Sequence, residues 1–216
     1  MTRTRIKICG IMHEDDARFA ADIGADAIGI VFHPASRRCV KNEQALRIVG
    51  VLPPFVMAVG LFVDASAEQM LHAAHSLGLG ALQLHGEEPP ELVAALAPFP
   101  VIKAVRVRKD DFASRLQRWR GQGANLRGVL LETDQAAPGG TGVENDWATI
   151  AQARADRLFD GLPPLIAAGG LTPENVARVI QTIRPWAVDV SSGVEDSPGR
   201  KSRDKLRAFV HAVHAA

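Results

Sequence analysis

The sequence lacks an apolar leader and any long hydrophobic run. Its first residues, Met1 to Lys7, carry several charges and contain no apolar stretch of the kind found in a signal peptide. No segment approaches the roughly 18 consecutive apolar residues that a membrane-spanning helix requires. We therefore expect a cytoplasmic protein with no membrane partner.

Cysteine and net charge are also scarce. The two cysteines, Cys9 and Cys39, are too few for a disulfide framework and lack the companion ligands of a zinc site, so we expect reduced thiols. The 25 Lys and Arg residues nearly balance the 24 Asp and Glu residues. No overall electric field therefore attracts nucleic acid or an anionic membrane, and any bound anion must be held locally.

The 216 residues, 47% of them hydrophobic, are enough to bury one substantial core. Short apolar runs alternate with longer segments of helical periodicity, which is typical of parallel strands joined by crossover helices. The expected strands are Ile6 to Cys9, Ala27 to Phe32, Val56 to Val63, Ala81 to Leu84, Val101 to Val105, Gly128 to Leu131, Leu165 to Ala168 and Ala187 to Val190. The expected helices begin near Glu14, Glu43, Ser66, Pro90, Phe112, Trp147, Thr172 and Arg203.

Eight such units with no linker between them predict an α/β protein, a single-domain (β/α)8 TIM barrel over residues 1–216. An open, doubly wound sheet is the competing architecture. Two helix starts carry clear signals: Ser66 with Gln69 forms a capping-box pattern, and Thr172 precedes a proline and an acidic residue. One extended, turn-rich segment, Thr133 to Asn145, directly follows the sixth strand.

Chemically active side chains gather at the expected carboxyl ends of the strands, where barrel enzymes hold their reacting groups. In chain order they are Lys7, Cys9, Arg38, Asp64, Gln83, His85, Lys103, Arg106, Glu132, Gly169, Gly170, Asp189 and Ser191. A structural protein would spread such groups over its outer helix faces. Their convergence on one rim predicts an enzyme.

The first strand brings two of these groups together. Lys7 and Cys9 are two residues apart, so their side chains project to the same side of the sheet. A nearby ammonium would stabilise the thiolate of a basic cysteine, although free cysteines commonly act as small buried hydrophobes. Asp189 either pairs with Lys7, because the first and eighth strands become neighbours in a closed barrel, or contacts the substrate. Cys39 has no such activator and is expected to be incidental.

Glu132 ends the sixth strand and is the candidate general acid. To deliver a proton near neutral pH, its pKa would have to be raised by burial or by another carboxylate. A solvated carboxylate that merely ends the strand is the alternative, and Asp134 competes for the acid role. His85 is either a hydrogen-bonded scaffold residue or a proton carrier.

Three glycine-rich segments follow late strands and predict a phosphate site. They are 139–142, 169–172 and 191–194, and the expected phosphate-binding residues are Gly140, Gly142, Gly169, Gly170, Ser192 and Gly193. Glycines let backbone N–H groups approach an anion closely. Barrels commonly hold a phosphate with the loops after strands seven and eight. A phosphorylated small molecule is therefore the expected ligand.

Taken together and in this order, the motifs resemble the phosphoribosylanthranilate isomerase family over almost the whole chain. They are Lys7-Ile8-Cys9-Gly10-Ile11, Ser36-Arg37-Arg38-Cys39-Val40, Leu82-Gln83-Leu84-His85-Gly86, Gly139-Gly140-Thr141-Gly142 with Asp146-Trp147, Ala168-Gly169-Gly170-Leu171, and Asp189-Val190-Ser191-Ser192-Gly193-Val194-Glu195. The resemblance implies a (β/α)8 barrel of tryptophan biosynthesis that acts without cofactor or metal.

The resemblance also implies a reaction, an Amadori rearrangement of N-(5-phosphoribosyl)anthranilate to the corresponding 1-deoxyribulose 5-phosphate. By family analogy Glu132 is the general acid that opens the sugar ring, and Cys9 is the general base that removes the C2′ proton. Arg38 would hold the anthranilate carboxylate and Asp189 the anthranilate amine. Lys7 and His85 complete the expected substrate contacts.

Three departures from the family pattern concern the acid and the second loop. Glu132 replaces an aspartate, which lengthens the acid by one methylene; Cys39 replaces an aromatic residue; and Lys41-Asn42 replaces Ser-Pro. The two changes in the second loop remove no group that the chemistry requires. The longer Glu132 keeps the acid if the loop adjusts, and Asp134 is the alternative acid.

The rival functions are a pentose-phosphate epimerase, an indole-producing lyase, and a catalytically silent barrel that binds a phosphorylated ligand. The epimerase usually needs a metal, and the rim offers no histidine cluster. We expect a monomer.

Overall fold

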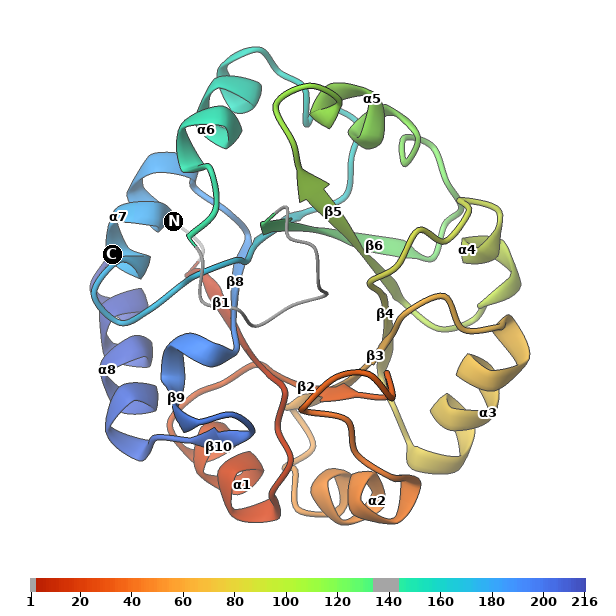
Figure 1. The fold of residues 1–216 in the computed structure, drawn as a ribbon, viewed down its shortest axis with the longest axis vertical. Coiled ribbons are helices and arrows are strands. Elements are labelled where there is room, and N and C mark those ends of the chain that lie inside the picture. The colour runs from red at the N-terminus through yellow and green to blue at the C-terminus, as the bar shows by residue number, and fades with distance from the viewer. Residues whose placement is uncertain (1–2, 134–143) are drawn as a thin grey trace.

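The computed structural model of the protein describes residues 3–133 and 144–216. Its centre is a closed barrel of eight parallel strands, each paired with the next along the chain, with the eighth paired to the first (Figure 1). The strands are β1 (Arg5–Cys9), β2 (Ala27–Val31), β3 (Met57–Phe62), β4 (Ala81–Leu84), β5 (Val101–Val107), β6 (Leu126–Thr133), β7 (Leu165–Ala167) and β8 (Ala187–Val190). The predicted (β/α)8 barrel is confirmed, and the open-sheet alternative is wrong because β8 closes on β1.

Helices form a ring around the strands (Figure 1). They are α1 (Glu14–Asp22), α2 (Asn42–Gly50), α3 (Ala67–Leu77), α4 (Leu92–Ala95), α5 (Phe112–Gln117), α6 (Trp147–Ala155), α7 (Val176–Ile183) and α8 (Arg203–His214). The capping box predicted for α3 is present, with Ser66 Oγ accepting from Gln69 N and Gln69 Oε1 accepting from Ser66 N. None of the helices in the described part is both long and apolar enough to cross a membrane.

The start of α7 differs from the prediction. Thr172 does not cap the helix; Asn175 occupies the N-cap position and α7 begins at Val176. The reason is a local turn, in which Asn175 Oδ1 accepts from Thr172 N while Asn175 Nδ2 donates to the carbonyl of Gly170. These bonds hold Asn175 at the N-cap position, while the Thr172 carbonyl accepts from Val176 N at the start of the helix.

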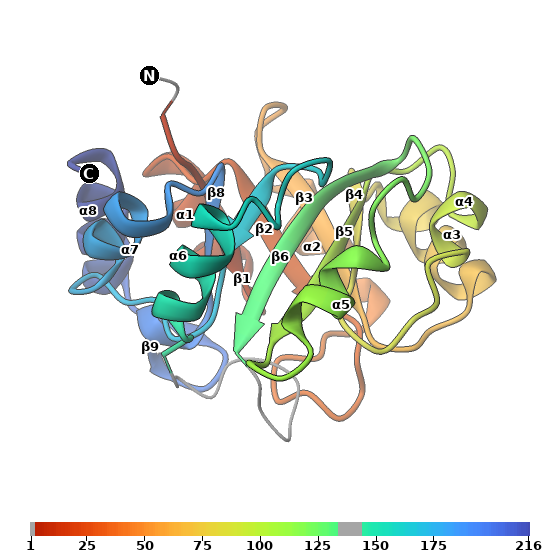
Figure 2. The ribbon, with the colours of Figure 1, turned by 90° about the horizontal axis from the view of Figure 1, so that it is seen from above.

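A short hairpin after β8 was not expected from the sequence. A 3-10 turn, η1 (Ser192–Val194), leads into β9 (Glu195–Ser197), which pairs antiparallel with β10 (Arg200–Lys201). Strands of two or three residues are too short to carry a periodic signal. In Figure 2 the hairpin lies at the same edge of the molecule as the arrowhead of β6, where the strands end.

Alternating strand positions build two separate apolar layers. One layer lies between the sheet and the helices and includes Ile8, Leu84 and Val129. The other lies inside the barrel and includes Ala104, Leu130, Ile166, Ala168 and Ala187. Because side chains two residues apart share a face, Glu132 continues the inward row of Leu130. The sheet therefore directs the last inward residue of each strand to the carboxyl-end opening.

Candidate active site

An ion pair between Lys7 and Asp189 lies inside the barrel. The two residues are register partners on β1 and β8, and Lys7 Nζ lies 2.8 Å from Asp189 Oδ1. Both side chains are buried. Burial lowers the pKa of Lys7, but the carboxylate of Asp189 and the thiol of Cys9 more than reverse this effect, so the pKa of Lys7 is raised. The predicted pairing of the first and eighth strands is thus present, and Lys7 stays protonated.

Cys9 is buried beside this pair. Gly29 on β2 leaves the space it needs, because a Cβ at that position would lie 2.7 Å from Cys9 Sγ and 3.0 Å from Lys7 Nζ. Burial raises the pKa of the Cys9 thiol, and the nearby ammonium of Lys7 offsets only part of that rise. The free thiol is therefore protonated at neutral pH, and Lys7 is the charge that favours its ionised form.

Glu132 enters the same interior from β6, on a different side of the barrel from β1 (Figure 1). Its side chain is only 15% exposed, so the interpretation of a solvated carboxylate is wrong. Burial, and then the negative charge of Asp189, raises the pKa of Glu132 to about 7. A carboxyl group with this pKa is about half protonated near neutral pH and can donate a proton there.

His85 lies next to Glu132, with its Nε2 atom 3.7 Å from Glu132 Oε2. Its other ring nitrogen, Nδ1, is hydrogen-bonded to the amide nitrogen of the buried Gln83, 2.9 Å away. Burial, and then the positive charges of Lys7 and Lys103, lowers the pKa of His85 to about 3. The imidazole is therefore neutral at physiological pH and acts as a hydrogen-bonding group beside Glu132.

Arg38, in the loop after β2, is clamped by Glu195. Two charge-assisted hydrogen bonds join them, from Nε to Oε1 at 2.8 Å and from Nη2 to Oε2 at 2.7 Å. Lys201 Nζ also binds Glu195 Oε1 at 2.8 Å and donates to the carbonyl of Ser191. Gly10 makes room for this arrangement, since a Cβ there would lie 2.4 Å from Arg38 Cδ. The cluster joins the loop after β2 to the loop after β8.

The glycines after β7 and β8 allow neighbouring loops to approach closely. A Cβ on Gly169 would lie 2.1 Å from Thr133 Oγ1, and one on Gly193 would lie 1.9 Å from the carbonyl oxygen of Leu171. Gly169 and Gly170 also have φ values of 92° and 65°, which glycine adopts without strain. Ser192 begins η1 beside them. The remaining two residues predicted to bind phosphate, Gly140 and Gly142, lie outside the described residues, as does Asp134.

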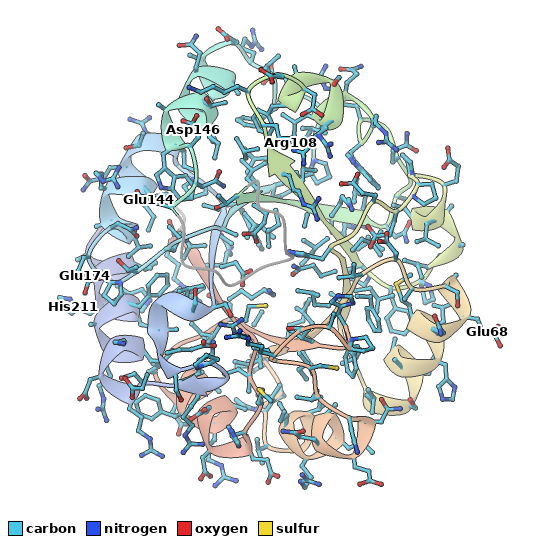
Figure 3. All side chains as sticks on the ribbon, viewed as in Figure 1. Glu68, Arg108, Glu144, Asp146, Glu174 and His211 are labelled. Carbon is cyan, nitrogen blue, oxygen red and sulfur yellow. The ribbon has the colours of Figure 1, made fainter. Side chains whose placement is uncertain are left out.

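Lys103, expected at the rim, and Cys39, expected to be incidental, both lie outside the barrel interior. Lys103 occupies an outward position of β5, where its ammonium pairs with Glu88 and lies over the ring of Trp119. Cys39 is partly exposed in the loop after β2, where its thiol makes only a long contact of 3.9 Å to the carbonyl of Val40. Helix residues such as Glu68 point away from the barrel (Figure 3).

Several residues that hold this site in place could not be predicted from the sequence. Glu195 appeared only within a motif, and Lys201, Glu88 and Asn145 were not singled out. Asn145 Nδ2 donates to the carbonyls of Leu131 and Ala168, which ties the ends of β6 and β7 together. Glu195 binds Arg38 across 157 positions, and Glu88 binds Lys103 across 15. Contacts of this kind leave no periodic signal in the sequence.

Residues 3–133 and 144–216 contain no group of three or more His, Cys, Asp or Glu side chains placed to hold a metal ion. The interior holds Cys9, Glu132, His85 and the Lys7–Asp189 pair.

The sequence matches a family model described as N-(5′-phosphoribosyl)anthranilate (PRA) isomerase over residues 6–212. The N-(5′-phosphoribosyl)anthranilate isomerase of Pseudomonas syringae pv. tomato is 48% identical over 216 residues, with 99% of each chain covered. That of Thermotoga maritima is 44% identical over 207 residues, covering 95% of this chain and 96% of the relative.

Solved structures agree with this family match. The Thermotoga maritima phosphoribosylanthranilate isomerase superposes with a TM-score of 0.88 at 42% identity, covering 99% of this chain and all of that one. A phosphoribosylanthranilate isomerase in complex with reduced 1-(o-carboxyphenylamino)-1-deoxyribulose 5-phosphate has a TM-score of 0.85 at 41% identity, with the same coverage. From its sequence and its fold alike, the chain belongs to the phosphoribosylanthranilate isomerase family.

Proposed function

We propose that the protein converts N-(5′-phosphoribosyl)anthranilate to 1-(2-carboxyphenylamino)-1-deoxyribulose 5-phosphate, with Glu132 as general acid and Cys9 as general base. Membership of the isomerase family supports the overall reaction. One observation supports the assignment of roles: the buried carboxyl of Glu132, with a pKa of about 7, faces the same barrel interior as the buried thiol of Cys9.

In the first step Glu132 protonates the ring oxygen of the sugar. The bond between this oxygen and C1′ breaks, and the nitrogen lone pair forms a protonated Schiff base at C1′. A general acid works best when its pKa lies near the working pH, and burial brings Glu132 to that range. The neutral His85, 3.7 Å away, adds no positive charge that would favour early loss of the Glu132 proton.

In the second step Cys9, which has lost its thiol proton to solvent, removes the proton from C2′ as a thiolate, and the electrons of that bond neutralise the Schiff base to give an enolamine. Tautomerisation then moves a proton from Cys9 to C1′ and the proton of the C2′ hydroxyl to Glu132, which regenerates the thiolate and the protonated carboxyl. Lys7 supports this step because its ammonium favours the thiolate. Both steps are proton transfers, so the proposal invokes no metal or cofactor.

The remaining predicted residues hold the substrate. The planar guanidinium of Arg38 suits the anthranilate carboxylate, and Asp189 suits the anthranilate amine. His85 contributes a neutral hydrogen-bonding group beside the sugar. The phosphate is assigned to the backbone of the late loops, at Gly169, Gly170, Ser192 and Gly193, because Gly169 and Gly170 have positive φ values and glycine backbone can approach an anion closely. Gly140 and Gly142 are proposed to take part on the sequence pattern alone.

The direct test is turnover of freshly generated phosphoribosylanthranilate, followed as the loss of its anthranilate fluorescence. We expect the wild-type protein to turn over, and Cys9→Ala and Glu132→Gln to lose nearly all activity while Asp134→Asn retains it. A wild-type protein that binds a product analogue but does not turn over would be a silent barrel, and the proposal would be wrong.

Oligomeric state and cellular location remain predictions, a monomer in the cytoplasm. A relative from Thermotoga maritima, with a TM-score of 0.85 and 39% identity, is described as a monomer generated from a dimeric enzyme. Light scattering of the purified protein measures its mass directly and decides between one chain and two.

A further inference from the structure

Another buried ion pair lies outside the barrel, between the sheet and the helices. Lys103 Nζ on β5 lies 2.5 Å from Glu88 Oε2 in the loop after β4, and both side chains are at least 95% buried. Burial raises the pKa of Glu88, but Lys103 lowers it further, so the carboxylate is charged. Neither residue has a part in the proposed reaction.

This pair holds both backbone polar groups of Gly86. Glu88 Oε1 accepts from Gly86 N at 2.8 Å, and Lys103 Nζ donates to the carbonyl of Gly86 at 2.7 Å. Glu88 Oε1 also accepts from Asp64 N at 3.2 Å, after the end of β3. Two side chains therefore tie together the carboxyl ends of three adjacent strands, β3, β4 and β5.

The bound loop is closely packed. A Cβ on Gly86 would lie 2.2 Å from Asp64 Oδ1, and the same oxygen accepts from Glu87 N at 2.8 Å. Asp64 itself has a φ of 50°, a strained value for a residue other than glycine. The peptide of Gly86 is thus held from both sides and has little room to shift.

His85 directly precedes Gly86, so the same bonds fix the backbone that carries the imidazole. Its ring is held at Nδ1 by Gln83 and faces Glu132 with Nε2. One pocket is lined by residues that include His85, Gly86, Glu88, Lys103, Arg106 and Glu132, so the ion pair and the proposed general acid border the same space.

Stability alone does not explain such a pair. Taking two charges out of water costs several kcal/mol per ion, and apolar replacements of a buried ion pair are often neutral or stabilising. What apolar side chains could not supply is the set of three hydrogen bonds to the backbone of Gly86 and Asp64.

We propose that Glu88 is a positioning residue for the isomerisation: with Lys103 as its buried counterion, it locks the loop after β4 so that the neutral His85 stays beside Glu132 and the sugar. The inference rests on the proposed function. Displacing a reacting group by about 1 Å can cost about 100-fold in rate, so loosening this loop should appear in kcat.

Two charge-free double variants separate geometry from charge. In Glu88→Gln/Lys103→Met the amide oxygen can still accept from Gly86 N and Asp64 N, whereas in Glu88→Leu/Lys103→Met no acceptor remains. We expect the Gln variant to stay within about fivefold of wild type in kcat and the Leu variant to fall by about 10- to 100-fold, with KM within about threefold in both. The break near pH 7 in the pH–rate profile should shift in the Leu variant only.

Asp26→Leu is the matched control for lost stability. The Asp26 carboxylate also pairs with a cation and accepts from a backbone amide, Ile6 N, but it lies at the amino end of β1. We expect a lower Tm and an unchanged kcat. If the Leu double variant does not fold, Glu88→Asp tests the inference instead. Aspartate keeps the charge of the pair but is shorter by one methylene, which moves the acceptor away from Gly86 N and Asp64 N. We expect its kcat to fall about tenfold.

A folded Leu double variant, or a folded Glu88→Asp protein, with wild-type kcat and an unshifted pH profile overturns the inference. Failure of the proposed function gives a different result in the same assay, because the wild-type protein itself would then not isomerise phosphoribosylanthranilate.

Discussion

Lys7 and Asp189, 182 positions apart in the sequence, are register partners on β1 and β8 and form a buried ion pair with Nζ 2.8 Å from Oδ1. The pair exists only because the barrel closes. Its positive end is next to the proposed base Cys9, and its negative end is the charge that, after burial, raises the pKa of the proposed acid Glu132. One ion pair therefore influences both proton-transfer groups.

Removing one partner of this pair should lower the free energy of unfolding more than removing both partners. Lys7→Met leaves the Asp189 carboxylate buried without its cation, and we expect a loss of about 3–5 kcal/mol in the free energy of unfolding. Lys7→Met/Asp189→Asn should recover most of that stability without recovering turnover. Urea denaturation measures the first effect and the fluorescence assay the second. Equal stability of the single and double variants would contradict the claim that an unpaired buried Asp189 carboxylate destabilises the fold.

Cys9→Ser should lower kcat by about 10²- to 10⁴-fold, because a hydroxyl is a much weaker acid than a thiol and cannot supply the base. Cys39→Ser is the control and should stay within about threefold of wild type, since this thiol is partly exposed and lies outside the barrel interior. If both variants keep wild-type kcat, Cys9 is only a small buried side chain.

Glu132→Asp should retain activity within about tenfold of wild type, since the chemistry is unchanged and only the reach of the acid differs by one methylene. Glu132→Gln should lose at least about 100-fold and should also lose the break near pH 7 in its residual pH–rate profile. A full loss of activity in Asp134→Asn, with Glu132→Gln active, would transfer the acid role to Asp134.

Glu132 should also make the fold less stable as the pH rises. Its pKa is raised from 4.5 to about 7 in the folded state, so the folded protein binds the proton more tightly and loses stability as the pH increases through this window. Glu132→Gln cannot lose a proton. We expect it to be more stable than wild type by about 1–3 kcal/mol at pH 8, with little of this gain at pH 4. Thermal unfolding at the two pH values checks the sign.

Glu195→Gln should weaken substrate binding more than the chemical steps. The Glu195 carboxylate fixes Arg38 through two hydrogen bonds and neutralises Lys201. Loss of its charge frees the guanidinium to adopt other orientations, so KM should rise about tenfold while kcat changes less than about threefold. A fall in kcat at constant KM would instead place Glu195 in the reaction itself.

The order of strands and helices could be predicted from the sequence because both leave local periodic signals. The shared face of Lys7 and Cys9 is also a local property, since it follows from the two-residue period of a strand. The position of Glu132 next to the end of β6 and the glycines after β7 and β8 were also recognised from local sequence, by the end of an apolar run and by glycine content. The hairpin of β9 and β10 was too short to be found, and the start of α7 was misplaced because Asn175 binds back to Gly170.

Tertiary structure alone decided which of these groups meet and how they ionise. Closure of the barrel pairs Lys7 with Asp189, and the loop after β8 brings Glu195 to Arg38 across 157 positions of sequence. Lys103, predicted at the rim, faces outward because an odd step along β5 reverses its side. A raised pKa at Glu132 depends on burial and on a charge from another strand. Desolvation and long-range charge are properties of three-dimensional packing, and no spacing along the chain encodes them.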